Sequence, residues 1–113
     1  MDTKSLLDKI TQTAQDIKAL DLVIFDMDGK SAITDYLVIC HGTSTAHTQG
    51  IADNICLALK KEGGVLPMGI EGREEGRWIL IDYNAVIVHI FLEDVRQQYS
   101  LEEIFSTFPK KEC

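Results

Sequence analysis

The chain has 113 residues, 45% of them hydrophobic, so it is most simply one domain with a modest core. Acidic residues outnumber Lys and Arg by 18 to 11, the formal net charge is −7, and the basic residues are scattered. Because backbone contacts to nucleic acid need clustered Lys and Arg, a dedicated nucleic-acid site is not expected. The acidic charge suits either a basic protein partner or solubility alone.

The cysteines and the N-terminal segment indicate the compartment. Cys40, Cys56 and Cys113 are odd in number and show no C-x-x-C spacing, which favours reduced thiols. The opening MDTKSLLDKI is too polar for a signal peptide, and no apolar stretch approaches the roughly 20 residues of a membrane span. We therefore expect a cytoplasmic protein without membrane contact.

The first half of the chain predicts a helix and two strands, followed by a second helix. Apolar residues recur every three or four positions over residues 3–20, as in an amphipathic helix. The runs LVIFDM (22–27) and YLVIC (36–40) are strand-like, and the short loop between them favours antiparallel pairing. Residues 42–64 read as a helix, capped by Ser44 or Thr45 and ended by Gly63-Gly64.

The second half predicts a short strand, a hairpin and a helix. The strand near PMGIEG is expected to lie parallel to the preceding one after a right-handed crossover. RWILIDYNAVIVHIF (77–91) reads as a hairpin that reverses around Asn84-Ala85, with Trp78, Leu80 and Asp82 on one face of its first arm and Ile79, Ile81 and Tyr83 on the other. Capping-box spacing between Ser100 and Glu103 starts a final helix, which Pro109 stops. The order αββαβββα predicts a single α/β domain over residues 1–108, with a mixed five-stranded sheet flanked by helices and a frayed tail over 109–113.

Two enzyme interpretations rest on short motifs. VIFDMDG places Asp26 and Asp28 as in a haloacid-dehalogenase-type phosphatase, but Lys30 follows the glycine and the later acidic metal-binding pair is missing. HGTS (41–44) before a helix resembles the phosphate-binding turn of nucleotidyltransferases, yet the carboxylates that follow, Glu71, Glu74 and Glu75, lie in a loop. We therefore expect no catalytic residue, metal or cofactor.

The histidines do not form a site by spacing. His41 follows a strand, His47 lies early in a helix, and His89 lies within a strand. An imidazole in an apolar strand usually has a designated hydrogen-bond partner, so a structural role for His89 is favoured. An interface or pH-sensitive role is the main alternative, and a metal ligand is the least favoured one.

Three segments resemble the ribosomal silencing factor family, also called Iojap-like proteins. They are TDYLVICHGTS, GIEGREEGRWILIDYNAVIVHIF and RQQYSLEEIF, and the likeness covers about residues 5–106. The pattern W-x-x-x-D-Y followed by V-x-V-H-x-F is long and specific. Three positions depart from the usual family pattern: Asn84-Ala85, His41 and Phe105.

The resemblance implies a non-enzymatic protein, homodimeric when free, with a nucleotidyltransferase-like fold that lacks the catalytic pair. Such proteins bind the large ribosomal subunit through ribosomal protein number fourteen, block joining of the small subunit and repress translation under nutrient limitation. The alternative is a large-subunit assembly factor that uses the same contact. A residual nucleotidyltransferase-like enzyme is a third interpretation.

We expect the partner contact on the hairpin and the loop before it. Trp78 would be the anchor, because aromatic side chains bury a large area at low entropic cost. The alternatives are core packing for Trp78 and a solvated loop for the glutamates. The full set of candidate contact residues is Glu71, Glu74, Glu75, Arg77, Trp78, Leu80, Asp82 and His89.

Overall fold

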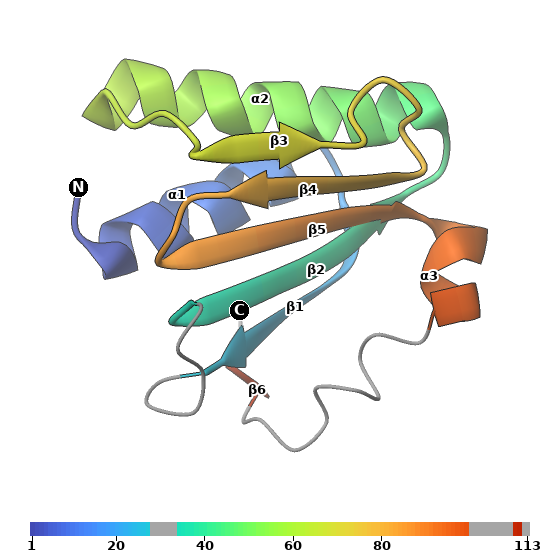
Figure 1. The fold of residues 1–113 in the computed structure, drawn as a ribbon, viewed down its shortest axis with the longest axis horizontal. Helices are drawn as coiled ribbons and strands as arrows, with labels where there is room; N and C mark the ends of the chain where they lie inside the picture. Colours follow the sequence, from blue (N-terminus) through green and yellow to red (C-terminus); the bar gives the residue numbers. More distant parts are fainter. Residues whose placement is uncertain (28–33, 100–109, 112–113) are drawn as a thin grey trace.

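A computed structural model describes residues 1–27, 34–99 and 110–111 (Figure 1). The helices are α1 (Thr3–Asp16), α2 (Thr45–Gly63) and α3 (Glu93–Tyr99). The strands are β1 (Leu20–Asp26), β2 (Tyr36–Gly42), β3 (Gly69–Glu71), β4 (Trp78–Asp82), β5 (Val86–Leu92) and β6 (Lys110–Lys111). No helix in these ranges is both long and apolar enough to cross a membrane.

The strands form one mixed sheet in the order β3-β4-β5-β2-β1-β6. Strands β2 and β5 are parallel, and every other neighbouring pair is antiparallel, including the predicted β1–β2 pair. The mixed sheet of five strands, β3 to β1, is therefore confirmed. Within the segment expected to be a frayed tail, Lys110 pairs with Phe25 and Lys111 with Ile24, which adds a short sixth strand at the β1 edge.

The predicted crossover was only partly right. Strand β3 runs in the same direction as β2, but β4 and β5 lie between them, and the parallel neighbour of β2 is β5. The hairpin pairing of β4 with β5 explains this, because β5 fills the position beside β2 that a simple strand–helix–strand unit would give to β3. The strand parallel to β2 and next to it is therefore β5, two strands later in the chain than the predicted β3.

The helix boundaries follow local capping. The Ser44 hydroxyl accepts the N–H of His47 at the start of α2, and Gly64 ends that helix with φ 63°, so both predicted caps are confirmed. Helix α1 ends at Asp16 rather than at residue 20, because Lys18 has a positive φ of 63° and Leu20 already pairs with His41. The helix predicted after Ser100 lies outside the described residues, and α3 was not predicted.

Helices α1 and α2 cover one face of the sheet (Figure 1). Their apolar stripes and the inward side chains of the strands form the main core, which buries Leu7, Ile10, Val38, Ile51, Ile55, Leu59, Ile79, Ile81, Val88 and Ile90 almost completely. A second, smaller cluster lies on the opposite face, around Phe25, Ile39 and Phe91. Among the described residues the two faces are thus covered unequally, and the candidate site lies on the one that α1 and α2 do not cover.

Candidate partner-binding face

The two sides of β4 differ in exposure as predicted. Ile79 and Ile81 are fully buried beneath the helices, whereas Trp78, Leu80 and Asp82 are only partly buried on the other side of the strand. Because one side of a strand is occupied by alternate residues, these three side chains lie on one face. We call this side of the sheet, opposite α1 and α2, the open face.

The open face has an apolar floor that extends across the sheet. The buried members of its cluster are Phe25, Met27, Leu37, Ile39, Phe91 and Val95, and half-buried Val23, Trp78, Ile87 and Leu92 pack around them. Among the described helices only α3 contributes to this cluster, through Val95. Half-buried apolar and aromatic side chains of this kind are typical of protein-binding surfaces.

Trp78 and His89 form a defined pair on this face. The indole Nε1 donates a hydrogen bond of 2.9 Å to Nδ1 of His89, and the Trp78 ring also packs against Phe91 with centroids 4.9 Å apart. His89 lies directly opposite Leu80 in the β4–β5 register. Burial lowers the pKa of His89 to about 4, so the imidazole is neutral near pH 7 and its Nδ1 can accept the hydrogen bond from the indole. The expected hydrogen-bond partner of His89 is therefore Trp78.

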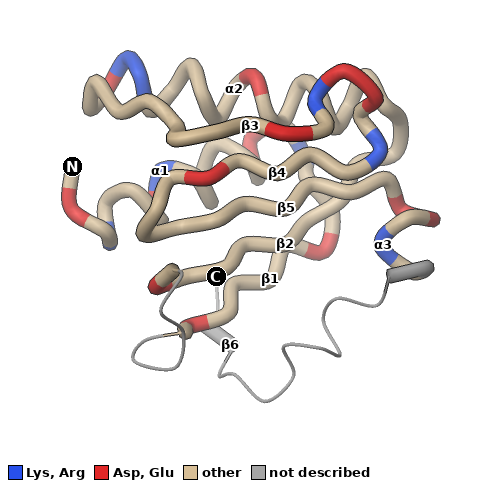
Figure 2. Tube along the Cα trace, viewed as in Figure 1, with Lys and Arg blue, Asp and Glu red and all other residues tan. Residues whose placement is uncertain are grey.

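Glu71 and Glu75 lie at one border of the open face, and Glu74 lies beside Glu75 on the same loop. Glu71 pairs with Leu80 across β3 and β4, so its side chain belongs to the same face. Residues 72–77 form a loop that closes through a 3.0 Å bond from Gly76 N–H to the Gly72 carbonyl. Glu74, Glu75 and Arg77 are exposed on this loop, which appears in Figure 2 as charged segments between β3 and β4.

A hollow of about 300 Å³ joins the loop to the open face. It is lined by Gly72, Glu75, Arg77, Trp78 and Val95. The structure thus brings the predicted contact residues together as an aromatic and apolar patch with a charged border. The ion pairs among described residues are Lys9–Glu62 and Arg73–Asp53, so the glutamates of the loop are in neither.

Asp82 has a structural role that the sequence did not reveal. Its Oδ1 accepts the backbone N–H of Asn84 at 2.7 Å, and Asn84 has a positive φ of 70°. This hydrogen bond holds the hairpin turn in place. The carboxylate of Asp82 therefore supports the turn as well as bordering the open face.

The other two histidines have structural partners of their own. His41 is buried, and its Nδ1 lies 2.8 Å from Nη1 of Arg96, which must be the donor because a guanidinium cannot accept. His47 Nδ1 accepts the N–H of Thr43, which leaves Nε2 to donate to the Ile17 carbonyl at 2.8 Å. The contact between His41 and Arg96, which are 55 residues apart, was not predicted from the sequence.

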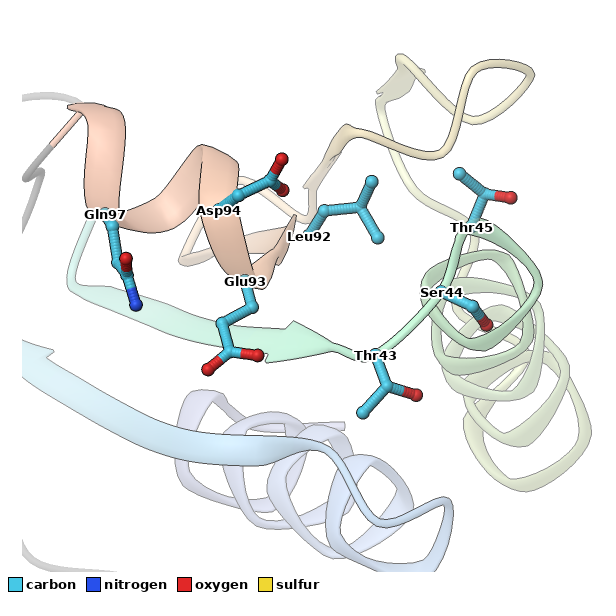
Figure 3. Close-up of a pocket in the computed structure, with 7 residues that line it drawn as sticks. All are labelled: Thr43, Ser44, Thr45, Leu92, Glu93, Asp94 and Gln97. Atoms are coloured by element: carbon cyan, nitrogen blue, oxygen red, sulfur yellow. The ribbon is translucent and has the colours of Figure 1, made fainter.

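Of the two enzyme motifs, only HGTS lies wholly within the described residues. Asp26 ends β1, and Asp28 lies outside the described residues. Thr43, Ser44 and Thr45 line a pocket of about 390 Å³ with Glu93, Asp94 and Gln97 (Figure 3). Its carboxylates start α3 instead of alternating on a strand, and Ser44 serves as the cap of α2. Over the described ranges, no three His, Cys, Asp or Glu side chains are grouped so that they could hold a metal ion.

The fold and this face define a small α/β protein with a partly exposed aromatic and apolar surface on its sheet. A family model described as ribosomal silencing factor during starvation matches residues 1–113. Ribosomal silencing factor RsfS of Haemophilus influenzae is 38% identical over 90% of this chain and 99% of its own length. The Bacillus subtilis protein of that name is 38% identical over 96% of this chain and 92% of its own length.

The chain therefore belongs to the ribosomal silencing factor family, which is regulatory and non-enzymatic. A crystal structure of a Chromobacterium violaceum protein superposes with a TM-score of 0.89 at 27% identity, covering 94% of this chain and 88% of that one. A mouse relative named mitochondrial assembly of ribosomal large subunit protein 1 is 26% identical over 88% of this chain and 45% of its own length. The resemblance seen in the sequence is thus confirmed.

Proposed function

We propose that this protein binds the large ribosomal subunit through ribosomal protein number fourteen and blocks association with the small subunit. Translation would then be repressed under nutrient limitation. Membership of the ribosomal silencing factor family supports this proposal. The observation that carries it is the partly exposed patch of Trp78, Leu80 and His89, with Glu71 and the loop of Glu74 and Glu75 beside it.

The mechanism is steric. The folded chain measures 34 × 33 × 23 Å, so even its thinnest dimension is far larger than the spacing between two contacting protein surfaces. A body of this size bound to the joining surface of one subunit would keep the other away without any chemical step. The effect then depends only on where the protein binds and how long it stays.

Each part of the candidate site has a distinct role in this proposal. Trp78 is the anchor, because a large aromatic side chain held against Phe91 and His89 can bury much area with little loss of freedom. Glu71, Glu74 and Glu75 face basic groups of the ribosomal protein, which speeds association and fixes orientation. Arg77 can pair with an acidic group there.

We also propose that the free protein is a cytoplasmic homodimer. Sedimentation equilibrium of the purified chain would contradict the dimer if it gave the monomer mass of 12.6 kDa across the micromolar range. The dimer would not affect the steric mechanism, which needs one bound copy.

The second candidate function is assembly of the large subunit through the same contact. The name of the mouse relative favours it, since that protein is described as acting in assembly of the mitochondrial large subunit. Immature large subunits in a deletion strain, together with normal subunit joining in extracts that contain the protein, would favour assembly over silencing.

The test of the proposed function combines binding and joining. Tagged protein is sedimented with separated large and small subunits, and subunit joining is then followed by light scattering. We expect cosedimentation with the large subunit alone and slower joining in proportion to occupancy. Joining at normal speed with the large subunit saturated would overturn silencing.

A further inference from the structure

The charged loop 72–77, which carries Arg73, Glu74, Glu75 and Arg77, is fastened to helix α2 by side chains of that helix. The Nε2 group of Gln49 lies 3.0 Å from the carbonyl oxygens of both Arg73 and Glu74. One amide thus donates to two successive carbonyls at the tip of the loop. Such contacts fix the backbone from which Glu74 and Glu75 project.

An ion pair joins the loop to α2 one helical turn further along. The Nε and Nη2 atoms of Arg73 donate to Oδ1 and Oδ2 of Asp53 at 3.0 and 2.6 Å. This two-point geometry is specific for guanidinium and carboxylate. The hydrogen bond from Arg73 keeps the pKa of Asp53 below its ordinary value, so the pair is charged near pH 7. The positive charge of Arg73 is therefore directed toward the helix.

A third contact fixes the end of the loop. Thr48 is completely buried, and its hydroxyl lies 2.6 Å from the Gly76 carbonyl and 2.9 Å from the Thr45 carbonyl within α2, so its one proton favours the shorter contact to the loop. Gly76 leads directly into Arg77 and Trp78, where β4 begins. We call Thr48, Gln49 and Asp53 the α2 clamp.

We propose that the α2 clamp holds loop 72–77 in its partner-binding conformation, so that Thr48, Gln49 and Asp53 are positioning residues for a basic protein surface. The inference rests on the proposed function. A loop that is already ordered loses little conformational entropy when the partner binds, which makes the free energy of association more favourable. Because Arg73 is paired with Asp53, the exposed charges left on the loop are Glu74, Glu75 and Arg77, and the excess of carboxylates favours a surface rich in Lys and Arg.

Hydrogen exchange of the free protein tests the clamp without any partner. Gln49→Met removes the donor while keeping side-chain length and charge. Gln15→Met makes the same change on the exposed surface of α1 and is the matched control. We expect the amides of residues 71–77 to exchange about fivefold faster or more in Gln49→Met and at the native rate in Gln15→Met. Unchanged exchange in Gln49→Met would overturn the proposal.

Binding to purified bacterial large subunits tests the positioning role. We expect Gln49→Met and Asp53→Asn to weaken binding by about tenfold, and Gln15→Met to leave it unchanged. In a Glu74→Gln/Glu75→Gln background the effect of Gln49→Met should largely disappear, because the carboxylates that it positions are gone. Faster loop exchange with native affinity, or an equal loss in both backgrounds, would overturn the positioning role. Failure of the unmodified chain to bind would instead overturn the proposed function. Binding of the unmodified chain is measured first, so the two failures are distinguishable.

Discussion

The indole Nε1 of Trp78 donates its hydrogen bond to Nδ1 of His89, which couples the position of an aromatic anchor to the protonation state of an imidazole. A protonated imidazole has no free acceptor, so the bond exists only while His89 is neutral. Burial lowers the pKa of His89 to about 4 from an ordinary value of 6.5. The pH-sensitive role considered for His89 is therefore confined to acidic conditions.

The first prediction concerns stability in mild acid. The unfolded chain protonates His89 near pH 6.5 and the folded chain only near pH 4, so the unfolded state binds more protons between these values. The contribution of His89 to the free energy of unfolding is therefore fully present above pH 6.5. It decreases as the pH falls toward 4, by up to about 3 kcal/mol. Urea unfolding at several pH values measures this loss.

His89→Gln is the control for that measurement, because a glutamine oxygen can accept from the indole but does not titrate. The difference in unfolding free energy between the native chain and this variant should change with pH between 6.5 and 4. A difference that is constant over the range would show that His89 is not held neutral by burial.

The second prediction separates the binding role of Trp78 from packing. Trp78→Ala should weaken binding to the large subunit by more than about 2 kcal/mol if this side chain is a hot spot. Because Trp78 is only half-buried, the variant should still fold, which circular dichroism and thermal unfolding will check. Unchanged binding by a folded Trp78→Ala protein would contradict the anchor role.

Trp78→Phe refines the result. Phenylalanine keeps an aromatic ring for packing on Phe91 but removes the donor to His89. We expect binding between that of the native chain and that of Trp78→Ala. If Trp78→Phe bound as poorly as Trp78→Ala, the hydrogen bond rather than buried area would dominate.

The parts of the fold that the sequence predicted are those with a local physical signature. Alternation from Trp78 to Asp82 was visible because one side of β4 is buried beneath helices and the other is not. The ends of α2 were visible because Ser44 and Gly64 make their capping contacts within a few residues. Local patterns of this kind need no knowledge of the rest of the chain.

The missed features depend on contacts between distant residues or on very short elements. Strand β6 has only two residues, Lys110 and Lys111, so it has no alternation, and its partner β1 is far away in the sequence. Over residues 93–97, where its side chains are described, helix α3 has one buried apolar residue, Val95, and one such residue gives no periodicity. Gln49 and Asp53 read as ordinary polar residues of a helix surface until the fold brings the loop to them.

The third prediction concerns the buried hydroxyl of Thr48. Thr48→Val keeps the shape of the side chain but leaves the Gly76 carbonyl without this donor, which should lower the free energy of unfolding by about 1–2 kcal/mol. Thr13→Val is the matched control, because the Thr13 hydroxyl donates to the Lys9 carbonyl within α1, where such bonds add little stability. Equal losses of unfolding free energy in the two variants, measured by urea unfolding, would show that the Thr48–Gly76 contact stabilises the fold no more than a hydrogen bond within one helix.

The fourth prediction compares two glycines with similar backbone angles and different surroundings. Gly72 and Gly64 have φ of 77° and 63°, so alanine is strained at both, at a cost of about 1 kcal/mol. At Gly72 an added Cβ would also collide with the carbonyl oxygen of Trp78, whereas at Gly64 it would meet no atom within 4 Å.

Gly72→Ala must therefore move the loop or the start of β4, while Gly64→Ala needs no movement. We expect unfolding free energy to fall by about 3 kcal/mol or more in Gly72→Ala and by about 1 kcal/mol in Gly64→Ala. Binding to the large subunit should fall only in Gly72→Ala, because that substitution displaces the backbone carrying Glu74, Glu75 and Trp78. Native affinity in a folded Gly72→Ala protein would mean that the partner does not contact this border of the open face.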